Sequence, residues 1–246
     1  MSVLNRMITL ISCGHKKIVA VLRPFAYYVP WKAVYIVFIF FILTLYLMFI
    51  VINDRFMHHI PWYERSAPCQ TPKSTLDLMV NLTFTVSDVL TKYGVNYVMC
   101  YGTLWGALRY GTILPWDNNV DFCALTSEIH KIDLLTLRKH LEPEGVTVVR
   151  NYRRGTYTIT KGPAEVVINV FYVTPFGEVL QDGFENRFLW FFQDSPLSFP
   201  QRLMALPFKT MPFHNRPLPV PHDDLEMLKY LYKDDWWIEK KPPDCK

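Results

Sequence analysis

The stretch GTLWGALRYGTILPWDNNVDF, from Gly102 to Phe122, decides how the chain is interpreted. It predicts a glycine turn, a short helix, a loop and then a strand that carries acidic residues. A Gly-Thr turn at the start of a helix exposes backbone N–H groups and a hydroxyl to an anion, so Gly102 and Thr103 are candidates for binding a phosphate. Arg109 closes the same helix and is a candidate clamp for that phosphate through two parallel hydrogen bonds.

The strand that follows predicts a weakened metal site. Asp117, Asn119 and Asp121 alternate along it and are expected to point to one face. Aspartates at both 119 and 121 would place two carboxylates side by side, close enough to bind one Mg²⁺. Residue 119, however, is Asn. On a regular strand, Asp117 and Asp121 lie about 13 Å apart, too far to share one ion. A third ligand is expected from the strand EVVINVF, where Glu165 and Asn169 share a face.

A second stretch predicts a membrane anchor. From Ala33 to Ile52, AVYIVFIFFILTLYLMFIVI runs for 20 residues without a charge. At about 1.5 Å per residue it spans roughly 30 Å, the thickness of a bilayer core. We expect a cytosolic tail over residues 1–32, a transmembrane helix over 33–52, a luminal stem over 53–73 and a luminal domain over 74–246.

Charge sets this type II, signal-anchor orientation. Five of the 26 basic residues precede the apolar run, whereas all 22 acidic residues follow it, beginning with Asp54. The five are Arg6, Lys16, Lys17, Arg23 and Lys32. The positive flank stays in the cytosol, so the C-terminal part faces the lumen. Because that part has no excess of positive charge, we expect no nucleic-acid binding, despite the net charge of +4.

The cysteines agree with this topology. Cys13 is expected in the cytosol, and Cys69, Cys100, Cys123 and Cys245 in the lumen, where disulfides persist. Four cysteines allow three full pairings, and the sequence does not choose among them. Cys69 and Cys245 lie in the proline-flanked ends of the domain and suggest a clasp, whereas Cys100 and Cys123 lie in strand-like runs and suggest buried thiols.

The luminal part predicts a mixed α/β sheet with helices packed on it. A helix capped by Ser74 should end near Gly94, and its polar face carries Asn81, the only asparagine in an N-x-S/T triplet and a candidate glycan acceptor. The other elements are expected as strands over 96–102, 118–125, 146–152, 156–160 and 165–173, helices over 127–140 and 223–232, and loops covering the site over 175–221.

Three blocks, in order, resemble the LicD/fukutin family. Its members read approximately G-T-L-L-G-A-x-R, a short gap and P-W-D-x-D-x-D, which GTLWGALRYGTILPWDNNVDF matches closely. VINVFYV resembles the family's later strand, which usually has an aspartate before Val-Phe. FHNRPLPVPHDDLEMLKYLYKDDWW resembles its C-terminal signature, so the resemblance covers roughly Asn96 to Trp237.

The resemblance implies a nucleotidyltransferase-type fold. It also implies transfer of a phospho-alditol or phosphocholine group from a CDP-linked donor to a glycan or glycoprotein hydroxyl, with Mg²⁺ or Mn²⁺, in a type II protein of the Golgi or endoplasmic reticulum. Gly102, Thr103 and Arg109 would then bind donor phosphates. The catalytic positions would be Asp117, Asp121 and Asn169, and the metal positions Asp117, Asn119 and Asp121.

Asn119 and Asn169 depart from the family pattern, because each stands where an aspartate is usual. An asparagine carbonyl can ligate a hard cation but brings no charge. The alternative to a transferase is therefore a weakened or inactive member that binds a donor or a partner in the secretory pathway. A plain membrane-tethered structural domain is a third reading, but it gives no reason to keep GTL and Arg109 in register.

Overall fold

The computed structural model describes residues 31–52, 68–188, 198–232, 236–239 and 241–245. The chain divides into two compact units, Met1–His59 and Ile60–Lys246. Most of the expected tail (1–32) and stem (53–73) therefore lies outside the described residues.

In the first unit, helix α2 (Trp31–Ile52) is apolar on every side. Its stretch Trp31–Phe49 has a mean hydropathy of 2.3, and none of it is buried within the structure. With 22 residues the helix is about 33 Å long, close to the thickness of the hydrocarbon core. By length and composition, α2 is suited to span a membrane, and it is the one described helix that is.

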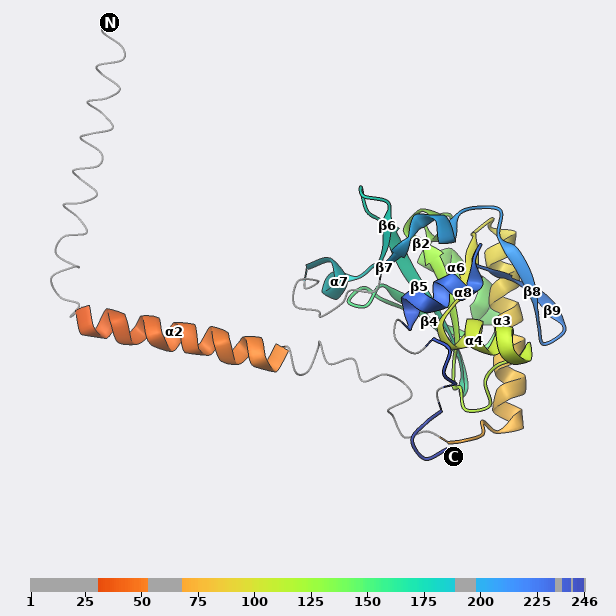
Figure 1. The fold of residues 1–246 in the computed structure, drawn as a ribbon, viewed down its shortest axis with the longest axis horizontal. Coiled ribbons are helices and arrows are strands. Elements are labelled where there is room, and N and C mark those ends of the chain that lie inside the picture. Colours follow the sequence, from red (N-terminus) through yellow and green to blue (C-terminus); the bar gives the residue numbers. More distant parts are fainter. Residues whose placement is uncertain (1–30, 53–67, 189–197, 233–235, 240, 246) are drawn as a thin grey trace, which may run out of the picture. The chain divides into compact units, whose positions relative to one another are not determined.

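The second unit is built on a seven-stranded mixed sheet with helices packed beside it (Figure 1). The strands are β1 (Tyr97–Met99), β2 (Val120–Leu125), β3 (Thr147–Asn151), β4 (Thr156–Lys161), β5 (Ala164–Val173), β6 (Glu178–Gln181) and β7 (Ser198–Pro200). Five follow the order β1-β2-β5-β4-β3, and β6 joins β5 to β7. Among these strands β2 and β5 pair in parallel and the other pairs are antiparallel. The expected mixed α/β fold is confirmed.

Helices of the second unit differ from the expected ones at the cap of α3, in the helix expected from Ser127, and in α7, which lies in a region expected as loops. They are α3 (Lys73–Lys92), α4 (Tyr101–Tyr110), α5 (Thr126–Ile129), α6 (Leu134–Leu141), α7 (Phe184–Phe188) and α8 (Asp224–Leu231), with 3₁₀ turns at Glu142–Glu144 and Gln201–Met204. Ser74 is not the cap of α3, because the cap position falls on Pro72 and no side chain bonds there. The single helix expected from Ser127 is instead two, because the Asp133 side chain accepts the N–H of Thr136 and starts α6.

The region expected as loops, 175–221, contains more regular structure than its sequence indicated. It holds β6, β7 and a separate hairpin of β8 (Lys209–Phe213) and β9 (Arg216–Val220). The hairpin pairs Pro212 with Pro217. Proline cannot donate a ladder hydrogen bond, but in a two-stranded hairpin its nitrogen can face outward. The short strands and the prolines hid the period-two pattern.

The two faces of the sheet differ in chemistry along β5. Val166 and Ile168 are buried and belong to the same hydrophobic core as Leu82 of α3, which packs against this strand. Glu165 and Asn169 alternate with them, so their side chains belong to the opposite face. The core thus fixes one face of β5, whereas the opposite face carries the polar Glu165 and Asn169 before the buried Phe171.

The four cysteines of the second unit form two disulfides. Cys69 is bonded to Cys245, as the ends of the domain suggested. Cys100 is bonded to Cys123, so the reading of these two as free thiols is wrong. The reason is the register: β1 pairs antiparallel with β2, Met99 lies opposite Phe122, and the chain brings the Cα atoms of the two cysteines to 5.9 Å.

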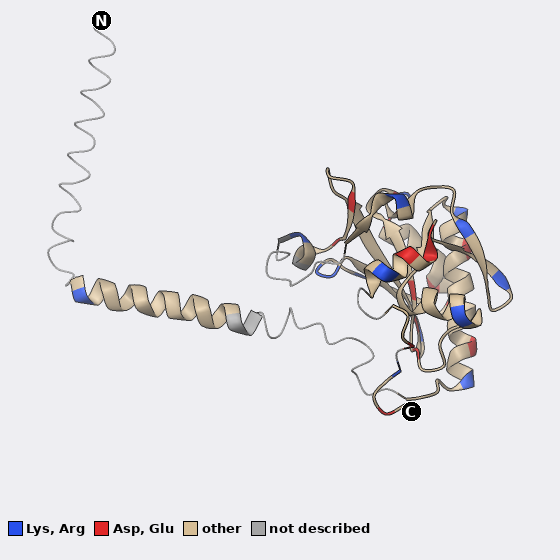
Figure 2. Ribbon diagram, in the orientation of Figure 1, with Lys and Arg blue, Asp and Glu red and all other residues tan. Residues whose placement is uncertain are grey.

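Charges of both signs are interspersed over the second unit, whereas α2 carries charge only at its start (Figure 2). Asn81 lies exposed on α3, as its place on the polar face predicted. That it carries a glycan, and that the chain binds no nucleic acid, remain predictions.

We expect the full-length protein, made in microsomes, to carry one N-linked glycan on the exposed Asn81. Endoglycosidase should increase its gel mobility, and Asn81→Gln should abolish that shift, whereas Asn118→Gln, outside any acceptor triplet, should not. An unglycosylated wild type whose C-terminus is cut by protease in intact microsomes would contradict the luminal orientation.

Candidate functional site

The site begins where β1 passes into α4. Tyr101, the first residue of α4, has a φ of 51°, an uncommon conformation for a bulky side chain. This sharp turn brings Gly102 and Thr103 into the first turn of the helix, and both are buried. The Thr103 hydroxyl accepts a hydrogen bond from the backbone N–H of Asp121, at 2.7 Å. Its oxygen therefore joins α4 to β2 in addition to any contact with an anion.

Position 102 has to be glycine because the Asp117 carboxylate occupies the space that a side chain would need. A Cβ atom at position 102 would lie 2.7 Å from Asp117 Oδ2, closer than such atoms approach one another. The carboxylate thus lies against the first turn of α4, where backbone N–H groups and the helix dipole favour negative charge. The place that the sequence assigned to a donor phosphate is next to a carboxylate of the protein itself.

Asp121 is held by two amides. The Nδ2 atom of Asn119 donates to Asp121 Oδ2 at 2.9 Å, and the Nδ2 atom of Asn169 donates to Asp121 Oδ1 at 3.0 Å. The parallel register explains the second contact, because Asn169 lies opposite Cys123, two residues beyond Asp121 on the same face. The expected convergence of positions 119, 121 and 169 is present in the structure.

Asp117 does not lie on a strand, so the 13 Å separation expected from strand geometry does not apply. Strand β2 begins only at Val120, and the N–H of Asp117 closes a turn onto the carbonyl of Leu114 at 3.0 Å. The charge of Asp121 contributes to a raised pKa at Asp117.

Both acids have pKa values well above their ordinary range. Burial, followed by the charge of Asp121, raises the pKa of Asp117 to about 7. Burial raises the pKa of Asp121 to about 6; the amides of Asn169 and Asn119 oppose this rise and the charge of Glu165 adds to it. Such values near neutrality suit groups that exchange protons.

Tyr101 and Glu165 add to this environment. Burial, then the charge of Asp121, raises the pKa of Tyr101 well above its usual value, so its hydroxyl stays protonated at neutral pH. Burial also raises the pKa of Glu165. Sequence analysis indicated Glu165 only as a residue that shares a face with Asn169, and it missed Tyr101. The position just before the Gly-Thr turn, where the backbone must reverse, was the available signal for Tyr101.

Arg109 makes its contacts at the other end of α4. Its guanidinium lies 3.3 Å from the ring centre of Trp105 and donates from Nη2 to the Trp237 carbonyl at 2.8 Å. The side chain is exposed, and six residues of helix, about 9 Å, separate it from Thr103. In this structure, Arg109 fastens the C-terminal segment, and its role toward a donor phosphate rests on the sequence resemblance alone.

The family model described as LicD/FKTN/FKRP, nucleotidyltransferase domain, matches residues 94–223, more than half of the chain. The chain belongs to the LicD family. The match contains the Gly102–Asp121 cluster and Asn169, and it ends just before α8.

The chain also resembles a solved structure, the crystal structure of ANT(2")-Ia in complex with adenylyl-2"-tobramycin. The two are 13% identical with a TM-score of 0.41, over 63% of this chain and 76% of that one. No curated protein matches the sequence significantly.

The polar groups of this LicD domain do not fit a centre of paired aspartates for a divalent metal. In the described parts of the chain, no three His, Cys, Asp or Glu residues gather as ligands. Both oxygens of Asp121 already accept from Asn119 and Asn169, whose amide nitrogens, not oxygens, face the carboxylate. A cation would have to displace these bonds, so we derive no chemical step through a metal.

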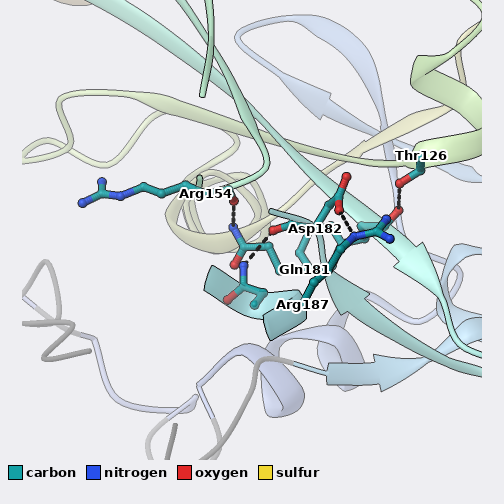
Figure 3. A network of polar contacts seen from close by, with 7 residues as sticks. Thr126, Arg154, Gln181, Asp182 and Arg187 are labelled. Carbon is teal, nitrogen blue, oxygen red and sulfur yellow. Dashed lines mark hydrogen bonds and ion pairs between the residues drawn. The ribbon is translucent and has the colours of Figure 1, made fainter. Parts of the chain in front are cut away.

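A second polar cluster lies at the corner between β6 and α7 (Figure 3), where the backbone N–H of Asp182 donates to the carbonyl of Val170, the residue after Asn169. Asp182 pairs with Arg187 at 2.5 Å, and Gln181 donates to the Arg154 carbonyl at 3.4 Å. The backbones pack so closely that a Cβ atom at Gly155 would lie 2.3 Å from the carbonyl carbon of Asp182. The cluster thus joins the β3–β4 turn to the β6–α7 corner.

Gly102→Ala should weaken ligand binding more than folding. The new methyl displaces the Asp117 side chain, which can rotate. Gly106→Ala is the matched control: its methyl would lie 2.4 Å from the backbone oxygen of Thr112, so it should destabilise the fold by about 1–3 kcal/mol. Thermal unfolding and cytidine-nucleotide titration separate the two effects; equal loss of stability in both variants would contradict the assignment.

The raised pKa values predict an unusual pH dependence of stability. Relative to the unperturbed value of 3.8, the folded protein keeps protons on Asp117 and Asp121 up to about pH 7 and 6. It therefore binds more protons than the unfolded chain in this window, and the free energy of unfolding should fall as pH rises from about 4 to 7.

Asp117→Asn should flatten this slope and raise stability at pH 7.5 by on the order of 1 kcal/mol, because it removes a charge that burial disfavours. The exposed Asp77→Asn is the control and should leave the slope unchanged. Denaturant unfolding between pH 4.5 and 8 measures both; a slope that Asp117→Asn leaves as steep as in wild type would refute the assignment.

Proposed function

We propose that the chain is a membrane-anchored glycosylation transferase of the secretory pathway, type II in the Golgi or endoplasmic reticulum. Its LicD domain would bind a CDP-linked donor and transfer a phospho-alditol or phosphocholine group to a hydroxyl of a glycan or glycoprotein. The family match supports the phosphotransferase class, and the apolar helix α2 supports the anchor. The single observation that carries the proposal is the pair of high-pKa carboxylates at the first turn of α4.

In this proposal Asp117 is the general base. It is the stronger base of the pair, with a pKa of about 7. It would take the proton of the acceptor hydroxyl as the hydroxyl oxygen bonds to the donor's distal phosphorus. The bond between the two phosphates would break, and CMP would leave with the electron pair. Backbone N–H groups at the first turn, beside Gly102 and Thr103, would receive the donor phosphates.

Asp121 would act as a fixed negative group. With both oxygens bonded to amides, it is less available to accept a further proton or a cation than Asp117. It would hold the pKa of Asp117 high, because its charge disfavours ionisation of its neighbour. A divalent ion, Mg²⁺ or Mn²⁺, would at most bind weakly here, and the donor charge would rest mainly on protein N–H groups.

The test uses the full chain in detergent. Cytidine diphosphate should bind with or without Mg²⁺, and CDP-choline or CDP-ribitol with a glycan acceptor should release CMP. Asp117→Asn should lower this turnover by at least about a hundredfold, the usual contribution of a general base, whereas Asp77→Asn should not. Absence of nucleotide binding in wild type would refute the proposal and leave a structural domain.

A second candidate function is donor binding or partner binding without turnover. The two amides on Asp121 favour it, because they stand where the family usually has aspartates. Binding of CDP with no CMP release from any CDP-linked donor would select this function over the first.

Replacing the two amides tests their part in metal binding. Asn119→Asp with Asn169→Asp should destabilise the fold without metal by a few kcal/mol, about 1.5–3 per lost charge-assisted hydrogen bond, and Mg²⁺ should restore stability. Asn118→Asp, which adds an exposed charge to the same loop, is the control and should gain no Mg²⁺ response. Thermal unfolding with and without Mg²⁺ decides; equal Mg²⁺ responses in wild type and double variant would contradict the expectation.

A further inference from the structure

The turn that carries Asp117 is fastened by a residue of the stem. The backbone N–H of Thr71 donates to the Pro115 carbonyl at 2.6 Å, and the Thr71 hydroxyl donates to the Asp117 carbonyl at 2.7 Å. One residue thus holds both ends of the turn Pro115–Asp117 from outside the sheet.

The C-terminal segment, described over residues 236–239 and 241–245, contacts the middle residue of the same turn, Trp116. Trp116 is only 8% exposed, and the ammonium of Lys241 lies 5.4 Å from the centre of its ring. The same segment also contacts the end of α4, where the Tyr110 hydroxyl donates to Glu239 Oε1 at 2.6 Å. Stem and C-terminal segment are therefore two sides of one clamp around this turn.

A disulfide joins the two sides of this clamp. Cys69, two residues before Thr71, is bonded to Cys245, four residues after Lys241. The bond closes a span of 176 residues. Cys69 is exposed, whereas Cys100 and Cys123 of the other disulfide are fully buried.

The clamp matters for the site because no strand pairing holds Asp117. The sheet ladder begins at Val120, so residues 117–119 lack the pairing that fixes Asp121. The Asp117 carboxylate nevertheless lies against Gly102, where a single methyl would displace it. Small movements of the Pro115–Asp117 backbone would move this carboxylate relative to the first turn of α4.

We propose that Thr71 is a positioning residue for Asp117, and that the Cys69–Cys245 disulfide anchors Thr71, so that ligand binding at the site depends on this disulfide. The consequence for ligand binding rests on the proposed function. The positioning itself concerns only the turn and is measurable without a ligand.

The test compares Thr71→Val with Thr71→Ser in the full chain in detergent. Valine keeps the shape and removes the hydroxyl donor, whereas serine keeps the donor. Amide hydrogen exchange at residues 117–119 should be about five- to tenfold faster in Thr71→Val, the factor expected for loss of one hydrogen bond, and near wild type in Thr71→Ser. The affinity for CDP should fall by a similar factor in the valine variant alone, with the melting temperature nearly unchanged.

The disulfide is tested by Cys69→Ser with Cys245→Ser, which leaves the buried disulfide intact. Exchange at 117–119 should rise as in Thr71→Val, and adding Thr71→Val should give little further increase, because both changes release the same turn.

Unchanged exchange at 117–119 in Thr71→Val would overturn the proposal, as would equal acceleration in the valine and serine variants or acceleration spread evenly over the domain. Unchanged exchange in the double serine variant would overturn the anchoring role of the disulfide. If wild type binds no CDP, the proposed function fails, and the exchange measurements still decide whether Thr71 positions the turn.

Discussion

The main-chain N–H of Asp121 donates to the hydroxyl of Thr103, and this bond joins the first turn of α4 to the beginning of β2. The Cys100–Cys123 disulfide ties the same two elements covalently, one residue before α4 and two residues after Asp121. The disulfide is fully buried and the hydrogen bond partly so, and together they hold the start of α4 against the acidic strand. The contacts of Asp117 with Gly102, and of Asp121 with its two amides, depend on this joint.

Electrostatics explains why Asn119 and Asn169 are tolerated beside Asp121. Burial disfavours the ionised forms of both Asp117 and Asp121, and the charge of Asp121 adds to the effect at Asp117. Two more carboxylates at 119 and 169 would add repulsion that only a cation offsets. The amides instead supply hydrogen-bond donors to both oxygens of Asp121, so the cluster is satisfied by the chain's own groups. The chain keeps the nucleotidyltransferase domain of the LicD family while both oxygens of Asp121 are occupied by amides of the protein.

Much of this arrangement could be predicted from local sequence. The glycine turn, the helix after it and the alternation along EVVINVF follow from residue type and period, and the convergence of Asn169 with Asp121 followed from expecting neighbouring strands. The place of Asp117 could not be predicted, because the strand was extended back to Asp117, whereas the backbone turns at Pro115 and Trp116 and β2 begins only at Val120. The contacts of Arg109 were missed for a different reason: Trp237 lies 128 residues away along the chain.

The sequence by itself determined the apolar span, the mixed α/β class and the family, because each depends on periodicity, composition or residues close together along the chain. Only the tertiary structure decided which cysteines pair, which oxygens the amides of Asn119 and Asn169 contact, and what holds Asp117. These depend on strand register and on segments far apart in sequence, such as Thr71 with Asp117 and Cys69 with Cys245. Their contacts form only when the core has fixed the positions of the elements that carry them. A local sequence pattern therefore cannot predict them.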